Sequence, residues 1–265
     1  MTDRSPLPLE ALQQHAQQAA LRSHVPYSGR EEGAVLLLSD GTWVPGVRVE
    51  SATFSLLIPA LLGALTIATA SGRRDVVAAV QTRTMREDEA LIIHQGLPVS
   101  FRRAAEGLAL VTTSELPAVG NQLDPRLDDA LTEMEEAGIT LARRIAKRAH
   151  VPDSDFPVGC VLQTTSGDLL PGVNVEHPDW SRILCAERTA ISMAITYGLI
   201  PERLYLTCLK DETGSPCGAC RQILVEHAPT LPIHMDRGAA PAEHTIASDL
   251  LPGAFRGDAL TAPSA

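Results

Sequence analysis

The sequence has few aromatic residues, no cysteine before Cys160, fewer basic than acidic residues and no long apolar run. Aromatic residues make up 3% of the chain and hydrophobic residues 45%, so we expect cores of leucine, valine, isoleucine and alanine. The lack of an apolar run of about 18 residues, and of a basic-then-apolar leader, predicts a cytoplasmic protein that does not enter membranes. The formal net charge of −10 disfavours a polynucleotide partner, because phosphate binding depends on lysine and arginine. A small molecule is the expected partner.

The cysteines gather in one region of the sequence. Three of the five, Cys185, Cys217 and Cys220, lie in the two stretches Cys-Ala-Glu-Arg and Pro-Cys-Gly-Ala-Cys-Arg-Gln, together with Glu187. A catalytic zinc typically has three protein ligands and a water, which matches three thiols beside a spare carboxylate. Two other interpretations are three unrelated buried thiols and a redox dithiol at Cys217 and Cys220. The redox scheme leaves the third cysteine and Glu187 without a role.

The chain contains an internal repeat. Shifted by 126 residues, positions 24–70 overlay positions 150–196 without a gap, and 17 of the 47 pairs are identical. We therefore expect two copies of one fold. A turn-forming stretch at 120–125 divides them into an N-terminal copy, residues 1–122, and a C-terminal copy, residues 123–265.

Each copy is expected to follow the order helix, strand, strand, helix, strand, helix, strand. For the N-terminal copy we expect helices at 9–21 and 54–70 and strands at 33–38, 43–49, 76–80 and 108–112. For the C-terminal copy we expect helices at 127–149, 185–197 and 217–227 and strands at 158–164, 169–175, 204–209 and 232–235. The pattern predicts the α/β class: two three-layer α/β/α domains, each a mixed sheet of about five strands flanked by helices.

The expected helix starts bring the candidate ligands together. Cys185 and Cys217 fall at helix N-termini, where free N–H groups and the helix dipole favour the thiolate. Cys220 lies three residues after Cys217 on the same first turn, so both sulfurs can reach one ion. Glu187 can contact a metal-activated water without being a ligand, and a carboxylate there can move protons. The residues suggest hydrolytic attack at a zinc centre.

These two motifs resemble the zinc signatures of the cytidine deaminase family. Phe156-Pro157-Val158-Gly159 and the segment from Gly172 to Glu176 are similar to the family pattern as well, and the resemblance covers about residues 127–256. It implies hydrolytic deamination of cytidine and 2′-deoxycytidine in pyrimidine salvage, with one Zn²⁺ per chain, in the C-terminal copy.

The resemblance also implies a role for each matching residue. Cys185, Cys217 and Cys220 would hold zinc, Glu187 would move protons, and Arg188 would hydrogen-bond the ligand sulfurs. Phe156 would pack near the pyrimidine. Asn174 and Glu176 would hydrogen-bond the ribose hydroxyls, and the backbone groups of Ala186 and Ser215 would hold the base edge.

The N-terminal copy lacks the chemistry. Under the shift, Cys185 corresponds to Pro59, Glu187 to Leu61 and Asn174 to Arg48. This copy is expected to be non-catalytic and to serve assembly. It resembles the degenerate half of long bacterial cytidine deaminases, with the order of the halves reversed. Two such chains would give the four-domain body of the short enzymes, which predicts a homodimer.

The segment His177-Pro178-Asp179-Trp180 departs from the family pattern at a loop that shapes the pocket. His177 is expected to be an idle loop residue, or alternatively to reach the metal or a sugar hydroxyl. Trp180 is expected at an interface, or alternatively over the sugar. The departure leaves two further functions open: deamination of another aminopyrimidine nucleoside, and nucleoside binding by a zinc-bearing pseudoenzyme.

Overall fold

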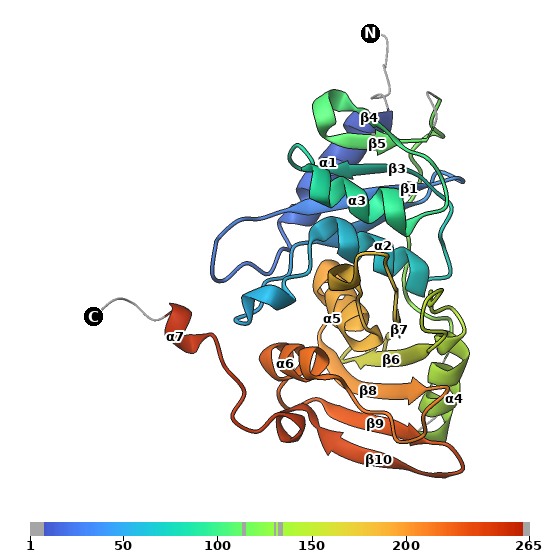
Figure 1. The fold of residues 1–265 in the computed structure, drawn as a ribbon, viewed down its shortest axis with the longest axis vertical. Coiled ribbons are helices and arrows are strands. Elements are labelled where there is room, and N and C mark those ends of the chain that lie inside the picture. Colours follow the sequence, from blue (N-terminus) through green and yellow to red (C-terminus); the bar gives the residue numbers. More distant parts are fainter. Residues whose placement is uncertain (1–7, 113–114, 130, 132–134, 262–265) are drawn as a thin grey trace.

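The chain forms two five-stranded sheets, which lie one above the other in Figure 1. The structure is a computed structural model and describes residues 8–112, 115–129, 131 and 135–261. Each sheet is flanked by helices, so the predicted α/β class with two sheets of about five strands is confirmed. Every helix among the described residues is too short or too polar to span a membrane.

The sheet of the N-terminal copy has the spatial order β2-β1-β3-β5-β4. Its strands are β1 (Gly33–Leu38), β2 (Trp43–Val47), β3 (Val76–Gln81), β4 (Arg102–Ala104) and β5 (Ala109–Val111), and its helices are α1 (Pro8–Ala20), α2 (Ala60–Ala70) and α3 (Glu87–Gly96). All four strand pairs described in this sheet are antiparallel, so the expected mixed sheet is not found in this copy, because β5 is entered from its antiparallel neighbour β4. Along β1 the side chains alternate: Val35 and Leu37 join a core with α1, and Leu36 joins a core with α2. Both faces of the strand are therefore covered.

The sheet of the C-terminal copy has the spatial order β10-β9-β8-β6-β7. Its strands are β6 (Val158–Thr164), β7 (Leu169–Val173), β8 (Pro201–Cys208), β9 (Pro232–Arg237) and β10 (Ala240–Ile246), and its helices are α4 (Glu135–Ala146), α5 (Ala186–Tyr197), α6 (Gly218–His227) and the short α7 (Asp258–Thr261). Strands β8 and β9 are parallel, and the crossover that this requires contains α6. This sheet is mixed, as expected.

Helices α2 and α5 lie between the two sheets (Figure 1). All eleven residues of α2 are buried, as expected for a helix that is apolar on every side. One hydrophobic core extends from Leu36 and Leu65 of the N-terminal copy to Leu162 and Ile191 of the C-terminal copy. The two copies are therefore packed into one body.

The contact between the copies is approximately two-fold symmetric. Arg22 Nη1 donates to the carbonyl of Thr196 at 3.2 Å, and Arg148 Nη1 donates to the carbonyl of Ala70 at 2.9 Å. The same 126-residue shift relates both the donors and the acceptors. Each copy thus makes the same bond to the other, which is the property of an isologous dimer interface, here formed within one chain.

Some element boundaries differ from the sequence expectation. The expected helix at 54–70 is divided into a 3₁₀ turn, η1 (Phe54–Leu56), and α2, because Pro59 is extended at the N-cap. The expected helix at 127–149 is reduced to α4; residues 127–129 and 131 are not helical, and residues 130 and 132–134 lie outside the described residues. Strands β4 and β10 are additional to the expected order.

Candidate metal centre

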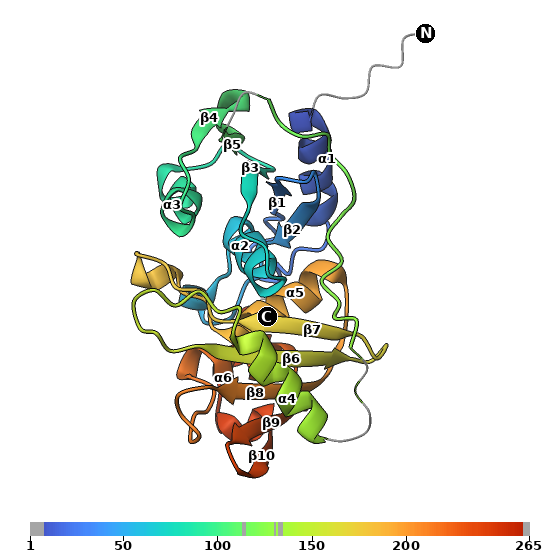
Figure 2. The same cartoon turned by 90° about the vertical axis from the view of Figure 1, so that its right-hand side faces the viewer.

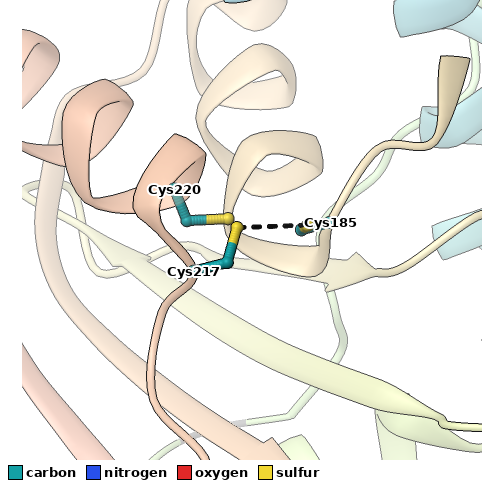
Figure 3. Close-up of side chains that lie close together, drawn as sticks. All are labelled: Cys185, Cys217 and Cys220. Carbon is teal, nitrogen blue, oxygen red and sulfur yellow. Dashed lines mark hydrogen bonds between the residues drawn. The ribbon is translucent and has the colours of Figure 1, made fainter. Parts of the chain in front are cut away.

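The three cysteine sulfurs converge at the starts of two helices. Cys185 is the N-cap of α5, Cys217 is the N-cap of α6, and Cys220 lies in the first turn of α6. Both N-cap residues have extended backbone, with ψ of 163° and 167°, so the chain turns sharply into each helix at its cysteine. The three sulfurs lie within 4.8 Å of one another (Figure 3). The predicted ligand set is thus brought together.

The sulfur spacing fits a zinc ion. The Sγ atoms of Cys185 and Cys217 are 3.8 Å apart. Zinc–sulfur bonds of about 2.3 Å at tetrahedral angles place two sulfurs about 3.8 Å apart. A set of three protein donors, which leaves the fourth tetrahedral position to water or substrate, is the kind that catalytic zinc sites use.

The electrostatics of the cluster favour a thiolate at Cys217. Hydrogen bonds from the Cys185 and Cys220 thiols, and from the backbone N–H groups of Cys220 and Ala219, lower the pKa of Cys217. The pKa of Cys185 is raised, first because its thiol donates to Cys217. A thiolate there attracts positive charge, and a divalent cation would replace the thiol protons.

Glu187 is enclosed beside these thiols. It lies in the first turn of α5 with an exposed fraction of 3%. Burial raises the pKa of Glu187 to about 7, with a further contribution from the negative charge of Cys217. At neutral pH such a carboxyl group exists in both protonation states, which is what a group that first takes and then gives a proton requires.

Arg188 connects the centre to the N-terminal copy. Its Nη2 donates to the carbonyl of Leu56 in η1 at 3.1 Å, and its buried Nε has no hydrogen-bond partner among the described residues. The predicted bond from Arg188 to a ligand sulfur stays a prediction. The contact with Leu56 was not expected, because it depends on how the two copies pack.

The predicted sugar-binding residues hold the loop before β6. The side-chain amide of Asn174 donates to the carbonyl of Phe156 at 2.9 Å and accepts from the N–H of Val158 at 2.8 Å. Glu176 Oε2 accepts from the N–H groups of Asp153 and Ser154. Phe156 is 36% exposed.

The remaining predicted contacts lie at the two helix starts. Ala186 is fully buried at the first turn of α5. Ser215 precedes α6, and its Oγ accepts from Arg221 Nη2 at 2.9 Å while Arg221 Nε donates to the carbonyl of Pro216 at 2.7 Å. Arg221 therefore holds the loop before Cys217 in place. Its place in the motif was the one signal of this role in the sequence.

The loop from His177 to Trp180, which differs from the family pattern, is anchored to the N-terminal copy. His177 is 2% exposed, its Nε2 lies 3.2 Å from the carbonyl of Leu91, and its Nδ1 accepts from the N–H of Asp179. The expectation of an idle histidine is therefore wrong, because both ring nitrogens make polar contacts that hold the loop. Trp180 is 69% exposed, on the 3₁₀ turn η3 (Trp180–Arg182).

Family models and individual known proteins that resemble this chain point to the same family. Models of the "Cytidine and deoxycytidylate deaminase zinc-binding region" match residues 132–233 and residues 2–97. The chain is 37% identical over 120 residues to a cytidine deaminase of Sporosarcina psychrophila, covering 44% of this chain and 88% of that protein. It is 40% identical over 96 residues to a probable cytidine deaminase of Dictyostelium discoideum, covering 36% and 65%. A crystal structure of cytidine deaminase from Burkholderia pseudomallei has 34% sequence identity and a TM-score of 0.44, covering 46% of this chain and 99% of that one.

Proposed function

Because the chain belongs to the cytidine deaminase family, we propose that its C-terminal copy is a zinc-dependent hydrolase that converts cytidine and 2′-deoxycytidine to uridine and 2′-deoxyuridine with release of ammonia. The observation that carries the proposal is the convergence of three sulfurs, two of them 3.8 Å apart, beside a buried glutamate. A metal-binding pseudoenzyme would not need that glutamate.

Proton transfer is assigned to Glu187. Cys185, Cys217 and Cys220 would hold a zinc ion, and that ion would supply the Lewis acidity that makes water a nucleophile at neutral pH. Glu187 takes the proton that the attacking water loses and delivers it to ring N3 of the substrate. It then moves the proton of the hydroxyl group now on C4 to the amino group, so the C4 carbonyl forms as the C–N bond breaks and ammonia leaves. A pKa of about 7 suits both directions of transfer.

Substrate recognition is assigned to side chains before β6 and after β7 and to backbone groups at the starts of α5 and α6. Asn174 and Glu176 would bind the ribose hydroxyls, and Phe156 would pack against the pyrimidine. The backbone groups of Ala186 and Ser215 would bind the base edge. The hydrogen bonds of Asn174 and Glu176 to the loop before β6 support this assignment, because they fix both side chains in one orientation.

The N-terminal copy, with its boundary at residues 122 and 123, is proposed to be non-catalytic. Pro59 occupies the N-cap of α2 where the other copy has Cys185, and Leu61 replaces Glu187. One catalytic zinc per chain follows. The proposed role of the N-terminal copy is to support the centre, which the bond from Arg188 to Leu56 favours.

A homodimer in the cytoplasm completes the proposal. Phe54 and Trp180 occupy equivalent positions in the two copies and are 89% and 69% exposed, so a second chain could cover both. A cytoplasmic location is favoured by the five free cysteines, because thiolate zinc ligands require a reducing compartment.

A nucleoside panel tests the proposed activity. The purified full chain, with its zinc content measured, is incubated with cytidine, 2′-deoxycytidine, other aminopyrimidine nucleosides and adenosine, and ammonia and products are quantified. We expect uridine products from cytidine and 2′-deoxycytidine and none from adenosine. Zinc-loaded protein that binds cytidine without turning it over would support the pseudoenzyme instead. Turnover of a different aminopyrimidine alone would reassign the substrate.

A further inference from the structure

A second group of metal-ligating side chains lies at the edge of the C-terminal sheet. It consists of Glu135 in the first turn of α4, His234 on β9 and His244 on β10. One ligand atom from each of the three lies within 4.8 Å of the others. No residue of the thiolate centre belongs to it: its residues lie on α4 and the β9–β10 hairpin, and the sulfurs lie at the starts of α5 and α6. Figure 2 looks onto the face of the sheet that α4 covers.

The strand register explains why the two imidazoles meet. His244 is directly opposite His234 in the antiparallel β9–β10 pair, so both side chains project from the same face of the hairpin. Their ring centroids are 4.4 Å apart. The first turn of α4 passes over this face and adds the carboxylate of Glu135.

The three side chains contact one another through their ligand atoms. Glu135 Oε1 is 3.5 Å from His234 Nδ1 and 2.8 Å from His244 Nε2, so the carboxylate pairs with both imidazoles. Among the described residues, no group outside the cluster hydrogen-bonds Glu135 Oε1 or His234 Nδ1. Three ligand atoms from three different elements therefore converge where an ion could replace the direct contacts.

The distances suit a divalent transition-metal ion. Zinc bonds of about 2.0–2.2 Å to nitrogen and oxygen place tetrahedral ligand atoms about 3.3–3.6 Å apart. This matches the 3.5 Å separation and needs a small opening of the 2.8 Å one. Imidazole nitrogen is the commonest protein ligand for such ions.

The surroundings fix the most buried ligand in place. The ring of His234 stacks on Tyr205 of β8 with centroids 5.0 Å apart. Gly138 of α4 lies so close to this tyrosine that a Cβ there would meet the ring at 2.4 Å, so α4 packs tightly over it. The side chain of His234 is 11% exposed, whereas that of His244 is 55% exposed. An ion can enter from the His244 side.

From these observations we infer that Glu135, His234 and His244 form a second, surface-accessible site for a divalent transition-metal ion, of the class Zn²⁺, Co²⁺ or Ni²⁺. Two imidazoles and one carboxylate prefer such ions to Mg²⁺ or Ca²⁺. The bound ion would link the start of α4 to the β9–β10 hairpin at the sheet edge. The site binds an added ion reversibly, beside the zinc of the thiolate centre.

Cobalt is a suitable probe because its spectrum distinguishes the two sites. Full-length chain containing one zinc per chain is titrated with Co²⁺, and bound cobalt and zinc are measured after gel filtration, together with the visible and near-ultraviolet spectrum. We expect one Co²⁺ to bind per chain without loss of zinc and without the intense sulfur-to-cobalt absorption of a thiolate site. The midpoint of thermal unfolding should rise with Co²⁺.

Variants complete the test. His244→Ala removes an exposed ligand with little risk to folding and should weaken Co²⁺ binding at least about tenfold; His234→Ala should abolish it. His94→Ala, which removes an exposed histidine of α3, is the matched control and should bind like the wild type. The absence of cobalt binding to the wild type, equal binding by His244→Ala, or cobalt that displaces zinc with thiolate absorption would each overturn the inference. The first of these results would identify the cluster as an ion pair of histidine and glutamate.

Discussion

Replacement of Glu187 by glutamine separates zinc binding from proton transfer. The carboxyl group is 3% exposed beside the sulfurs, and glutamine has almost the same shape, so the fold and the three thiolate ligands are retained. Glutamine cannot accept a proton. Each general acid–base transfer contributes about 10²–10⁴ in rate, and Glu187 is assigned two. We therefore expect Glu187→Gln to lower kcat by about 10⁴ or more, which corresponds to about 5.5 kcal/mol in the barrier.

The assay is uridine formation by chromatography, with zinc per chain measured on the same sample. Glu226→Gln is the matched control, because Glu226 is another partly buried glutamate of the C-terminal copy. Its carboxylate accepts from Tyr27, Ser51 and the N–H of Ala52 in the N-terminal copy. That variant should lose stability and keep kcat. A Glu187→Gln protein that holds zinc and works within about tenfold of wild type would refute the assigned role.

Three further predictions concern binding, metal retention and pH. Glu176→Gln should raise KM for cytidine by about tenfold to a hundredfold, because a sugar contact is lost. Glu50→Gln, at the equivalent position of the N-terminal copy, is the control and should leave KM unchanged. Equal effects of the two substitutions on KM would assign Glu176 to folding alone. Cys220→Ser should lose the tightly held zinc, whereas Cys208→Ser, the control, should keep about one zinc per chain by elemental analysis. Zinc retained by Cys220→Ser would exclude the three-sulfur site. Burial lowers the pKa of His227 to about 4 from its ordinary 6.5, so the unfolded chain takes up this proton first as the pH falls. Stability should therefore be unaffected above pH 6.5 and decline between about pH 6.5 and 4, by at most about 3 kcal/mol, in denaturant titrations. His227→Gln should remove that part of the decline, and an unchanged profile would contradict it.

The position of each cysteine at a helix start could be predicted from sequence, because it depends on local geometry. Cys217 and Cys220 are fixed relative to each other by one helical turn, and the helix start at Cys185 is determined by its own backbone. The 126-residue repeat likewise predicts two similar sheets. The symmetric donors Arg22 and Arg148 lie just before the two repeated segments, at positions that the same shift relates.

The contacts between the copies could not be predicted in this way. The bonds of Arg188 to Leu56 and of His177 to Leu91 join residues more than eighty positions apart, and no local pattern marks their partners. The short strand β4 has three residues of which two are exposed, so it carries no alternating pattern. The pairing of His234 with His244 depends on the register of β9 with β10, a strand with mostly exposed residues.

The zinc dependence of cytidine turnover tests the central claim most directly. The full chain is freed of metal, and initial rates of uridine formation are measured as zinc is restored in known proportion to protein. A single catalytic centre made of Cys185, Cys217, Cys220 and Glu187 predicts a rate that rises linearly and reaches its plateau at one zinc per chain. A rate that continues to rise to a second equivalent, or that does not depend on zinc, would contradict it.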